Sequence, residues 1–447
     1  MAEDDIYRSS TQYRLWSFSR SALHELRERT NHLAAARVRA AFPPSAPVPD
    51  CLTPSEELAL VTYYCKQCLS LGSFLDFPTG VVATATQYLK RFYLTNSPMT
   101  YHPKALLPTA LFLATKTENH HVPLRDFARR LPRTEPDDVL APEFLLTQGL
   151  RFAFDVRHPH RGLKGAYLEL RALADGKGVA PPRSARAGAS PADLQREMRR
   201  LPPRSTKGEA AATATALADT DKDRDAAPPA ALQQRLQDAY GRANESLRGP
   251  ALLSDAYFHF SPAQIWLGAL WAADEPLARF YVATKLPAAS GAAPTRQDGG
   301  GGGAPLASTK RLVPALQACA DMLAAHSDDG AGPSSSSSSS ATAAAAAPGA
   351  RSKDDLVRID KKLYQCRNPD KLDLVGLNRA QKRDQAGLDG RLDENVAKRR
   401  RVEREKGEKE AEEVFGGALK GVGNGGGGED AGGGEGTTEA EKKEMAA

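Results

Sequence analysis

The stretch VVATATQYLKRFYLTNSPMTYHPKALLPTALFLATKTEN, residues 81–119, contains two apolar segments of helical length joined by a short polar turn. In the first segment, apolar residues recur at helical spacing at Val82, Ala85, Leu89 and Phe92. Lys90 and Arg91 are expected to point away from that face. The second segment is apolar on nearly every side, which is typical of a helix surrounded by other helices. Together the two segments predict the interior of a helical bundle.

The second segment ends abruptly in two charged residues, Lys116 and Glu118. A lysine in the last turn of a helix is favoured by the partial negative charge of the carbonyl end, so Lys116 has an ordinary structural explanation. The other explanation is a rim of the bundle that a second protein covers. Residues elsewhere in the chain are needed to distinguish these two explanations.

Apolar residues are distributed unevenly along the 447-residue chain. Residues 1–175 and 229–327 carry most of the aromatic and branched apolar residues, whereas the remainder is rich in Ala, Gly, Ser, Pro and charge. Such polar segments bury too little surface to offset the entropy of ordering them. Period-two alternation is almost absent, so the apolar regions are predicted to be all-α and to form two five-helix bundles in tandem.

The first bundle is predicted over residues 51–157, after an N-terminal segment, 1–50, with a helix at about 20–41. One face of that N-terminal helix is expected to carry Leu23, Leu26, Thr30 and Leu33. The helix that opens the bundle has an N-cap, a first-position proline and a capping-box glutamate at Thr53, Pro54 and Glu56. The last helix of the bundle is predicted within DDVLAPEFLLTQGLRFAF, residues 137–154.

The second bundle is predicted over residues 158–327. One of its helices has a capping box at Ser261, Pro262 and Gln264. Another is expected to bury a stripe at Leu232, Leu236, Ala239 and Ala243. A low-complexity insertion at about 176–228 and a Gly-rich loop at 290–304 interrupt this bundle and are expected to be disordered.

Three further segments follow the second bundle. They are a low-complexity linker at 328–350, a charged region at 351–415 that is expected to be helical, and a Gly-rich tail at 416–447 that is expected to be disordered.

The composition favours neither an enzyme nor a nucleic-acid binder. The net charge of +5 is small for this length, whereas dedicated nucleic-acid binders usually have a large, clustered basic excess. Five cysteines without regular spacing argue against a secreted disulfide scaffold and favour a reducing compartment. The CKQC motif at 65–68 has no second cysteine pair to complete a zinc site. We therefore expect no catalytic residue, cofactor, metal, direct nucleic-acid contact or membrane association.

A short basic cluster in the C-terminal region has two interpretations. Four consecutive basic residues form it, at Lys398, Arg399, Arg400 and Arg401. Such a run in a polar tail is typical of a nuclear-import signal. A solvated face of a charged helix is the alternative interpretation, and the sequence leaves both open.

Several motifs resemble the cyclin family. The opening stretch resembles the centre of a cyclin box, in which KRFY closes the second box helix and FLATKTE closes the third. Within the family the chain is similar to the cyclin H type. That similarity is carried by YRSSTQYRLWSFS at 7–19, NSPMTYHP at 96–103, VRHPHRGLKGAYLEL at 156–170 and LSDAYFHFSPAQI at 253–265. It covers about 1–175 and 229–327.

The resemblance implies a partner rather than a reaction. Cyclins bind a cyclin-dependent kinase and reposition its αC helix, so that the kinase active site assembles. The family's kinase-facing lysine and glutamate match Lys116 and Glu143 here, and Glu118 is a further candidate beside them. The bundle rim would then carry charges because the kinase covers it.

The cyclin H type also implies a setting for the protein. The resemblance implies a CDK-activating kinase that acts on RNA polymerase II within TFIIH, in transcription and cell-cycle control. It further implies a RING-finger assembly factor as a third partner, and a nuclear location.

The chain departs from the pattern of cell-cycle cyclins in two respects. Those cyclins carry a Met-Arg-Ala-Ile-Leu patch on the first box helix, which holds substrate docking peptides. Here the same place reads EELALV, residues 56–61, so the resemblance does not extend to that groove. Pro108 and Pro142 fall inside the expected third and fifth helices, where proline removes a hydrogen bond and kinks the axis.

Three other functions remain open on the sequence alone. A cyclin C type subunit of the Mediator kinase module is the nearest alternative, because VVATATQYLKRFY fits that group well. A TFIIB-like factor with tandem cyclin folds would bind promoter DNA, but it would need an N-terminal zinc ribbon, and no cysteine precedes Cys51. A scaffold that binds short peptides rests on analogy of fold alone.

Overall fold

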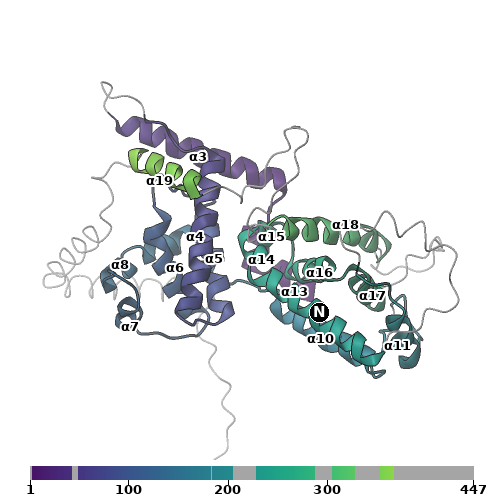
Figure 1. Cartoon of the computed structure of the whole chain (residues 1–447). Coiled ribbons are helices and arrows are strands. Elements are labelled where there is room, and N and C mark those ends of the chain that lie inside the picture. Colours follow the sequence, from purple (N-terminus) through teal and green to yellow (C-terminus); the bar gives the residue numbers. More distant parts are fainter. Residues whose placement is uncertain are drawn as a thin grey trace, which may run out of the picture. The chain divides into compact units, whose positions relative to one another are not determined.

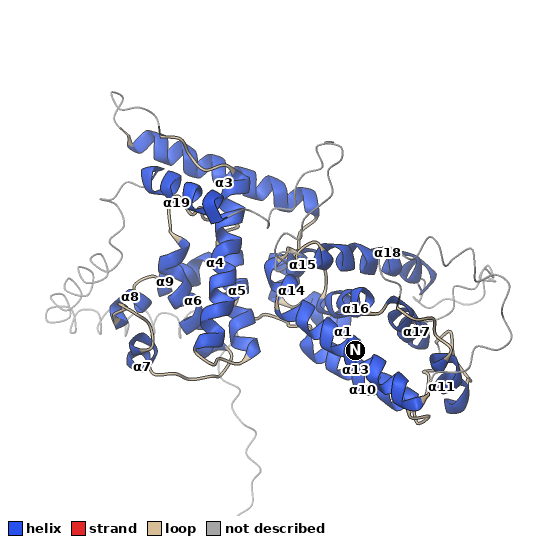
Figure 2. Ribbon diagram, viewed as in Figure 1, coloured by secondary structure: helices blue, strands red, loops and turns tan. Residues whose placement is uncertain are grey.

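The structure is a computed structural model that describes residues 3–42, 49–182, 184–204, 228–286, 305–327 and 353–366. Helices are the only regular elements among these residues (Figure 2). The prediction of an all-α fold is therefore confirmed.

Three helices precede the first bundle: α1 (Glu3–Ser9), α2 (Thr11–Trp16) and α3 (Arg20–Ala41). The hydroxyls of Ser10 and Ser19 cap α2 and α3 by accepting from backbone amides. The buried face of α3 differs from the expected one, because Leu33 is half exposed. Asn31 is buried in its place, since its side-chain amide donates to the carbonyl oxygen of Leu52 at 2.7 Å.

The first bundle contains α4 (Pro54–Phe74), α5 (Thr79–Phe92), α6 (Pro103–Thr117), α7 (Leu124–Arg129), α8 (Pro136–Leu140) and α9 (Glu143–Gly149). The capping box at the start of α4 is present as predicted. Helix α5 packs against both α4 and α6 (Figure 1). All residues from 81 to 92 are buried, so α5 is as fully enclosed as α6.

Lys90 and Arg91, which were expected only to point away from the apolar face, are both buried. They tolerate burial because each donates to backbone carbonyl oxygens that lie far away in the sequence. The helical spacing of apolar residues gives no information about these distant carbonyl oxygens, so it cannot predict that a charged side chain is buried.

The last helix of the first bundle is not continuous, which corrects the expectation that Pro142 lies inside a helix. The chain forms α8 and α9 with a break at Ala141 and Pro142, and Pro142 is the N-cap of α9. Proline fits the start of a helix, where its missing N–H has no intrahelical partner to lose. Pro108, in contrast, does lie inside α6.

The second bundle contains α10 (His160–Ala174), α13 (Pro229–Arg248), α14 (Pro250–Leu253), α15 (Ala256–His259), α16 (Pro262–Ala273), α17 (Glu275–Lys285) and α18 (Pro305–Ala324). Helix α16 is central and packs against α10, α13, α17 and α18. Its capping box and the buried stripe on α13 are both as predicted. A Cβ atom at Gly268 would lie 2.8 Å from the Cys319 sulfur, so the close packing of α16 on α18 requires glycine.

Part of the insertion expected to be disordered is a packed element. Helix α11 (Pro191–Arg199) starts at an N-cap, Ser190, and buries Leu194 and Met198 in the core of the second bundle. These two residues are spaced i, i+4 and therefore lie on one face. A short amphipathic helix is easily missed within a Pro- and Ala-rich segment. Residues 205–227 lie outside the described residues.

Helix α19 (Lys353–Cys366) belongs to the charged C-terminal region and lies beside α3 and the start of α4 (Figure 1). Its apolar face buries Ile359, Leu363 and Cys366 against residues of both helices. The remainder of the region, 367–415, lies outside the described residues. The same holds for the loop 290–304, the linker 328–350, the tail 416–447 and the basic cluster 398–401.

Replacing Leu363 by alanine is expected to release α19 from the first bundle. Leu363 is fully buried between α3 and α4, and a buried Leu→Ala change typically costs about 2–5 kcal/mol. Limited proteolysis would detect the change as faster cleavage within 353–366. Tyr364→Ala is the matched control, because Tyr364 is 81% exposed on the same helix. Equal cleavage rates in both variants would contradict a packed α19.

Candidate functional site

Lys116 and Glu143 meet at one edge of the first bundle. Lys116 is in the last turn of α6, and Glu143 is the first residue of α9. The Lys116 ammonium donates to Glu143 Oε1. It also lies 4.8 Å from the centre of the Phe112 ring. The side chains are 38% and 22% exposed, so both groups are accessible from one side.

The local chain geometry holds this pair in place. Helix α6 ends at its C-cap, Glu118, and the next residue, Asn119, has a φ of 56°, a left-handed conformation typical of a helix end. Lys116 therefore lies at the carbonyl end of α6, where positive charge is favoured. The Pro142 N-cap starts α9 at Glu143, so the break between α8 and α9 positions the carboxylate.

An exposed aromatic ring accompanies the ion pair. Phe144, which follows Glu143 in α9, is 66% exposed. We refer to Lys116, Glu143 and Phe144 as the α6–α9 rim. A half-buried ion pair beside an exposed aromatic residue is typical of a protein–protein interface, where aromatic residues are enriched.

Glu118 does not join the α6–α9 rim. Its Oε1 accepts a hydrogen bond from Thr84 Oγ1 at 2.6 Å, so the carboxylate is held against α5. Thr84 Oγ1 lies 2.8 Å from His158 Nε2, and His158 Nδ1 lies 3.1 Å from the Tyr257 hydroxyl. Burial lowers the pKa of His158 to about 3, so its ring is neutral. A neutral ring with its proton on Nε2 satisfies every donor in this series, from Tyr257 to Glu118.

Glu118 instead lines a cavity of about 660 Å³ between the first bundle and the helices α1, α10, α13 and α16. The cavity wall includes Arg161, Lys164 and Arg248, whereas the acidic Asp155 there is paired with Arg157. The first turn of α10 has no acidic residue and no side-chain cap. This cationic wall suits an anionic group, because uncapped N–H groups and the helix dipole attract negative charge. The basic residues of VRHPHRGLK, residues 156–164, are the feature of the sequence from which this cationic wall could have been predicted.

Lys90, from the KRFY motif, connects the two bundles, whereas its neighbour Arg91 bonds to the end of the first bundle. The Lys90 ammonium donates to the carbonyl oxygens of Leu252, at 3.2 Å, and of Ser254. Burial lowers the pKa of Lys90, and the nearby Asp255 carboxylate opposes that effect. Arg91 donates to the Asp155 carbonyl oxygen at 3.1 Å, on the segment that leads into α10. The sequence did not predict this connection.

Helix α3 adds a second connection through Asp255. The two terminal nitrogens of the Arg27 guanidinium, Nη1 and Nη2, donate to the Asp255 carboxylate at 2.8 and 2.7 Å. The segment before α3 also takes part, because the Phe18 amide donates to the Phe258 carbonyl oxygen at 2.8 Å. The N-terminal helices therefore contact both bundles, which places them where they can fix the arrangement of the bundles.

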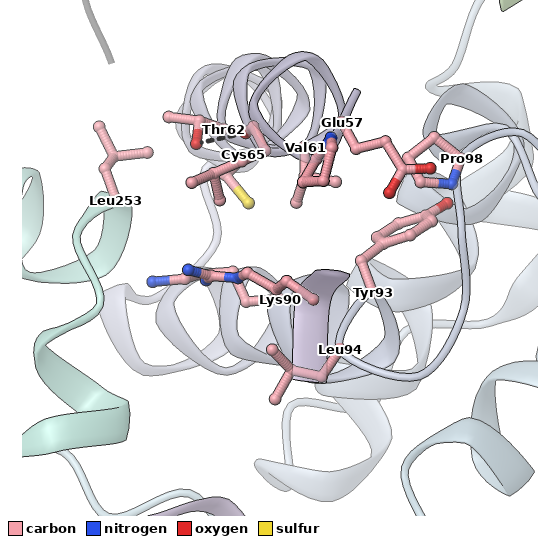
Figure 3. Close-up of a pocket in the computed structure, with 12 residues that line it drawn as sticks. Glu57, Val61, Thr62, Cys65, Lys90, Tyr93, Leu94, Pro98 and Leu253 are labelled. Atoms are coloured by element: carbon pink, nitrogen blue, oxygen red, sulfur yellow. Dashed lines mark hydrogen bonds between the residues drawn. The ribbon is translucent and has the colours of Figure 1, made fainter. Parts of the chain in front are cut away.

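A small cavity lies beside Lys90, between α4 and α5 (Figure 3). In the close-up, the Cys65 sulfur lies on the side of α4 that faces Lys90, and Glu57 lies near Tyr93 and Pro98. The volume of about 30 Å³ has room for one water molecule, whereas sites for small ligands are usually some ~300–1,000 Å³. We therefore interpret this cavity as a small packing defect rather than a ligand site.

Glu57 is a carboxyl group enclosed at the junction of α3, α4 and the loop before α6. It accepts from the Ser97 hydroxyl, and Asn31 also contributes a hydrogen bond. Burial dominates over these bonds and raises the pKa of Glu57 from 4.5 to about 7. The folded protein therefore holds a proton between these pH values that the unfolded chain has released, and its stability falls as the pH rises through that window.

Glu57→Gln is expected to remove this pH dependence. A difference of one pKa unit corresponds to about 1.4 kcal/mol, so wild type should lose about 3 kcal/mol of unfolding free energy relative to the variant between pH 4.5 and 7. Urea unfolding at pH 5 and pH 8 measures it. Glu25→Gln, on the exposed face of α3, is the control. Parallel pH profiles of wild type and Glu57→Gln would contradict a protonated Glu57.

The EELALV segment at the start of α4 is covered by the chain itself. Ala59 and Leu60 pack against α19, and the Lys362 ammonium lies 3.0 Å from carboxylate oxygens of both Glu56 and Asp50. The surface formed by this segment is therefore covered by α19.

Cys65 and Cys68, the two cysteines of the CKQC motif, pack in the core of the first bundle. Burial raises the pKa of the Cys65 thiol to about 12. Within the described ranges, no group of three His, Cys, Asp or Glu residues is arranged to hold a metal ion. None of the helices described is long and apolar enough to cross a membrane.

The chain is similar to known proteins over both bundles. A cyclin C-terminal domain family matches residues 158–324. The cyclin CCL1 of Saccharomyces cerevisiae is 29% identical over 65% of this chain and 64% of its own length. The cyclin mcs2 of Schizosaccharomyces pombe is 37% identical over 38% of this chain and 56% of its own length. The chain thus spans less than two thirds of either relative.

A solved structure is similar over a larger part of the chain. It is the structure of the CAK complex from Chaetomium thermophilum bound to ATP-γ-S. One of its chains is 33% identical, with a TM-score of 0.59, over 86% of this chain and 96% of its own length.

Proposed function

The chain belongs to the cyclin family, and we propose that it is a regulatory subunit of the cyclin H type that binds and activates a cyclin-dependent kinase. The kinase would be of the CDK-activating type that acts on RNA polymerase II within TFIIH. The observation that carries the proposal is the likeness of nearly the whole chain to a subunit of a CAK complex. The chain itself would catalyse no reaction.

The α6–α9 rim would be the main kinase contact. The Lys116 ammonium has three N–H donors and uses one of them on Glu143, so the others can reach carbonyl oxygens of the partner. The second carboxylate oxygen of Glu143 can accept from a backbone N–H. Phe144 would be buried on binding. These contacts would hold the segment at the entry of the kinase αC helix and so favour its active position.

Glu118 would have a different part in the contact. Its Oε1 is engaged by Thr84, so only Oε2 is available to a partner. Glu118 lies on the wall of the cationic cavity, and a kinase segment that reaches it would also meet the basic residues there. We therefore propose Lys116 and Glu143 as one unit and Glu118 as a separate contact.

The remaining partners follow from the cyclin H assignment. A RING-finger assembly factor would bridge cyclin and kinase, and TFIIH would be the larger assembly. We propose a nuclear location, for which residues 398–401 are the candidate import signal. Helix α3 would support activation indirectly, because Arg27 links it to the second bundle.

Affinity purification of the full chain from native extract, with identification of the bound proteins by mass spectrometry, tests the proposal. We expect a cyclin-dependent kinase and TFIIH subunits. Mediator subunits would favour the cyclin C type instead, and a complex without any kinase would contradict both. A gel shift on promoter DNA tests the TFIIB-like alternative. That alternative requires the purified chain to bind the DNA.

A further inference from the structure

Two cysteines from distant parts of the sequence meet where α19 ends. Cys366 is the last residue of α19, and Cys51 precedes the Thr53 N-cap of α4. The Cys366 sulfur lies 3.0 Å from the carbonyl oxygen of Asp50, the residue directly before Cys51, and Cys51 contributes to the raised pKa of Cys366. Both pack in the cluster that joins α3, α4 and α19. Both are free thiols in the structure.

The two thiols differ in accessibility. Cys51 is partly exposed, and it is the one cysteine of the five that is not buried. Cys366 is buried, and its thiol donates to the carbonyl oxygen of Asp50 at 3.0 Å. Burial raises the pKa of the Cys366 thiol to about 11, although the Lys362 ammonium opposes this effect. An oxidant from solution would therefore meet Cys51 first, with Cys366 held beside it as the second thiol.

A disulfide between Cys51 and Cys366 would attach the end of α19 covalently to the first bundle. Helix α19 is held by the apolar contacts of Ile359 and Leu363 and by the ion pairs of Lys362 with Asp50 and Glu56. All of these are non-covalent. A covalent bond at the end of the helix would prevent α19 from leaving the surface of α4 that it covers.

We propose that Cys51 and Cys366 are an oxidative modification site, at which hydrogen peroxide forms an intramolecular disulfide that locks α19 onto the first bundle. In the first step the Cys51 thiolate attacks a peroxide oxygen, the O–O bond breaks, and Cys51 becomes a sulfenic acid while hydroxide leaves and takes up a proton. In the second step the Cys366 thiolate attacks the Cys51 sulfur, the S–O bond breaks, and a second water forms. Two thiols lose two electrons, and one peroxide is reduced to two waters.

The resting state in a reducing compartment is the dithiol, so the disulfide would report exposure to peroxide. The test uses the full chain, purified reduced and treated with an equimolar amount of hydrogen peroxide. We expect a mass loss of two hydrogens that dithiothreitol reverses. Digestion at both basic and acidic residues should yield a peptide that links Cys51 to Cys366 and excludes Cys65, which lies beyond Glu56 and Glu57.

Cleavage within the linker 328–350 gives a second readout. On a denaturing gel without reductant, the fragment that carries α19 should stay attached to the oxidised chain and separate from the reduced one. Cys51→Ser and Cys366→Ser should both abolish this retention, whereas Cys319→Ser, a buried cysteine in α18, should keep it. Because Cys51 is partly exposed, Cys51→Ser should fold even if Cys366→Ser does not. Oxidation that stops at sulfenic acid, pairs either thiol with another cysteine, or links two chains would overturn the proposal.

Discussion

Alanine at Lys116 or at Glu143 is expected to weaken binding of the partner kinase by about 2–5 kcal/mol, or roughly 30-fold to several-thousand-fold in Kd. The two groups are bonded to each other and partly desolvated, so each substitution leaves the other charge without its partner at a covered surface. Because they act as one unit, the double variant should lose little more than either single variant. Titration of purified kinase, followed by calorimetry or by kinase activity, measures both effects.

The fold should be nearly unaffected by these substitutions. Partly exposed ion pairs contribute only about 0–1 kcal/mol to stability, so the melting temperature should change little. Arg196→Ala is the matched control, because it breaks an exposed ion pair with Asp193 on α11, away from the α6–α9 rim. Full binding by the folded Lys116→Ala, Glu143→Ala double variant would show that the kinase contacts another surface.

Asp255→Asn is expected to destabilise the protein by about 3 kcal/mol. The carboxylate accepts both hydrogen bonds of the Arg27 guanidinium and is also near the buried Lys90 ammonium. The amide removes the negative charge and cannot accept both bonds, so two cations lose their counter-charge. Because Asp255 and Arg27 are still 24% and 19% exposed, we expect the lower end of the range for buried pairs. Denaturant unfolding of the purified variant measures the loss.

The pH dependence of stability and a second variant test whether the loss in Asp255→Asn comes from the unpaired charges of Arg27 and Lys90. The Arg27 bonds and the neighbouring cations hold the pKa of Asp255 below its ordinary value despite burial. Its stabilisation is therefore complete at neutral pH and is lost only in acid, as the pH falls from the range in which a free aspartate titrates to the lower pKa of Asp255 in the folded protein. Lys90→Met in the Asp255→Asn background should recover part of the loss, since it removes the unpaired buried charge. A purely additive double variant would show that Lys90 and Asp255 are not coupled.

The regular elements could be predicted from the sequence because their signals are local. The capping boxes at Thr53 and Ser261 involve residues three positions apart, and the buried stripe on α13 depends only on helical spacing. The kinase-facing residues came from resemblance to a family rather than from physical reasoning. Spacing alone would have left Lys116 as an ordinary residue at a helix end.

The errors share one physical cause, which is that the deciding contacts lie far away in the sequence. The burial of Lys90 was not predicted, because the carbonyl oxygens that accept its hydrogen bonds belong to the second bundle. Helix α11 was missed because its short apolar face is recognisable only once the core that it packs against is known. Glu118 stays a predicted kinase contact, but Thr84 holds its carboxylate on the wall of the cationic cavity rather than beside Lys116.

The sequence by itself determined the all-α class, the main helix boundaries and the family, since helical period, capping and motif order are properties of neighbouring residues. Only the tertiary structure decided that Glu143 starts a new helix opposite Lys116, that Lys90 of α5 connects the two bundles, and that α19 covers the start of α4. Each of these depends on a donor and an acceptor, or two apolar faces, that come together only when the chain folds.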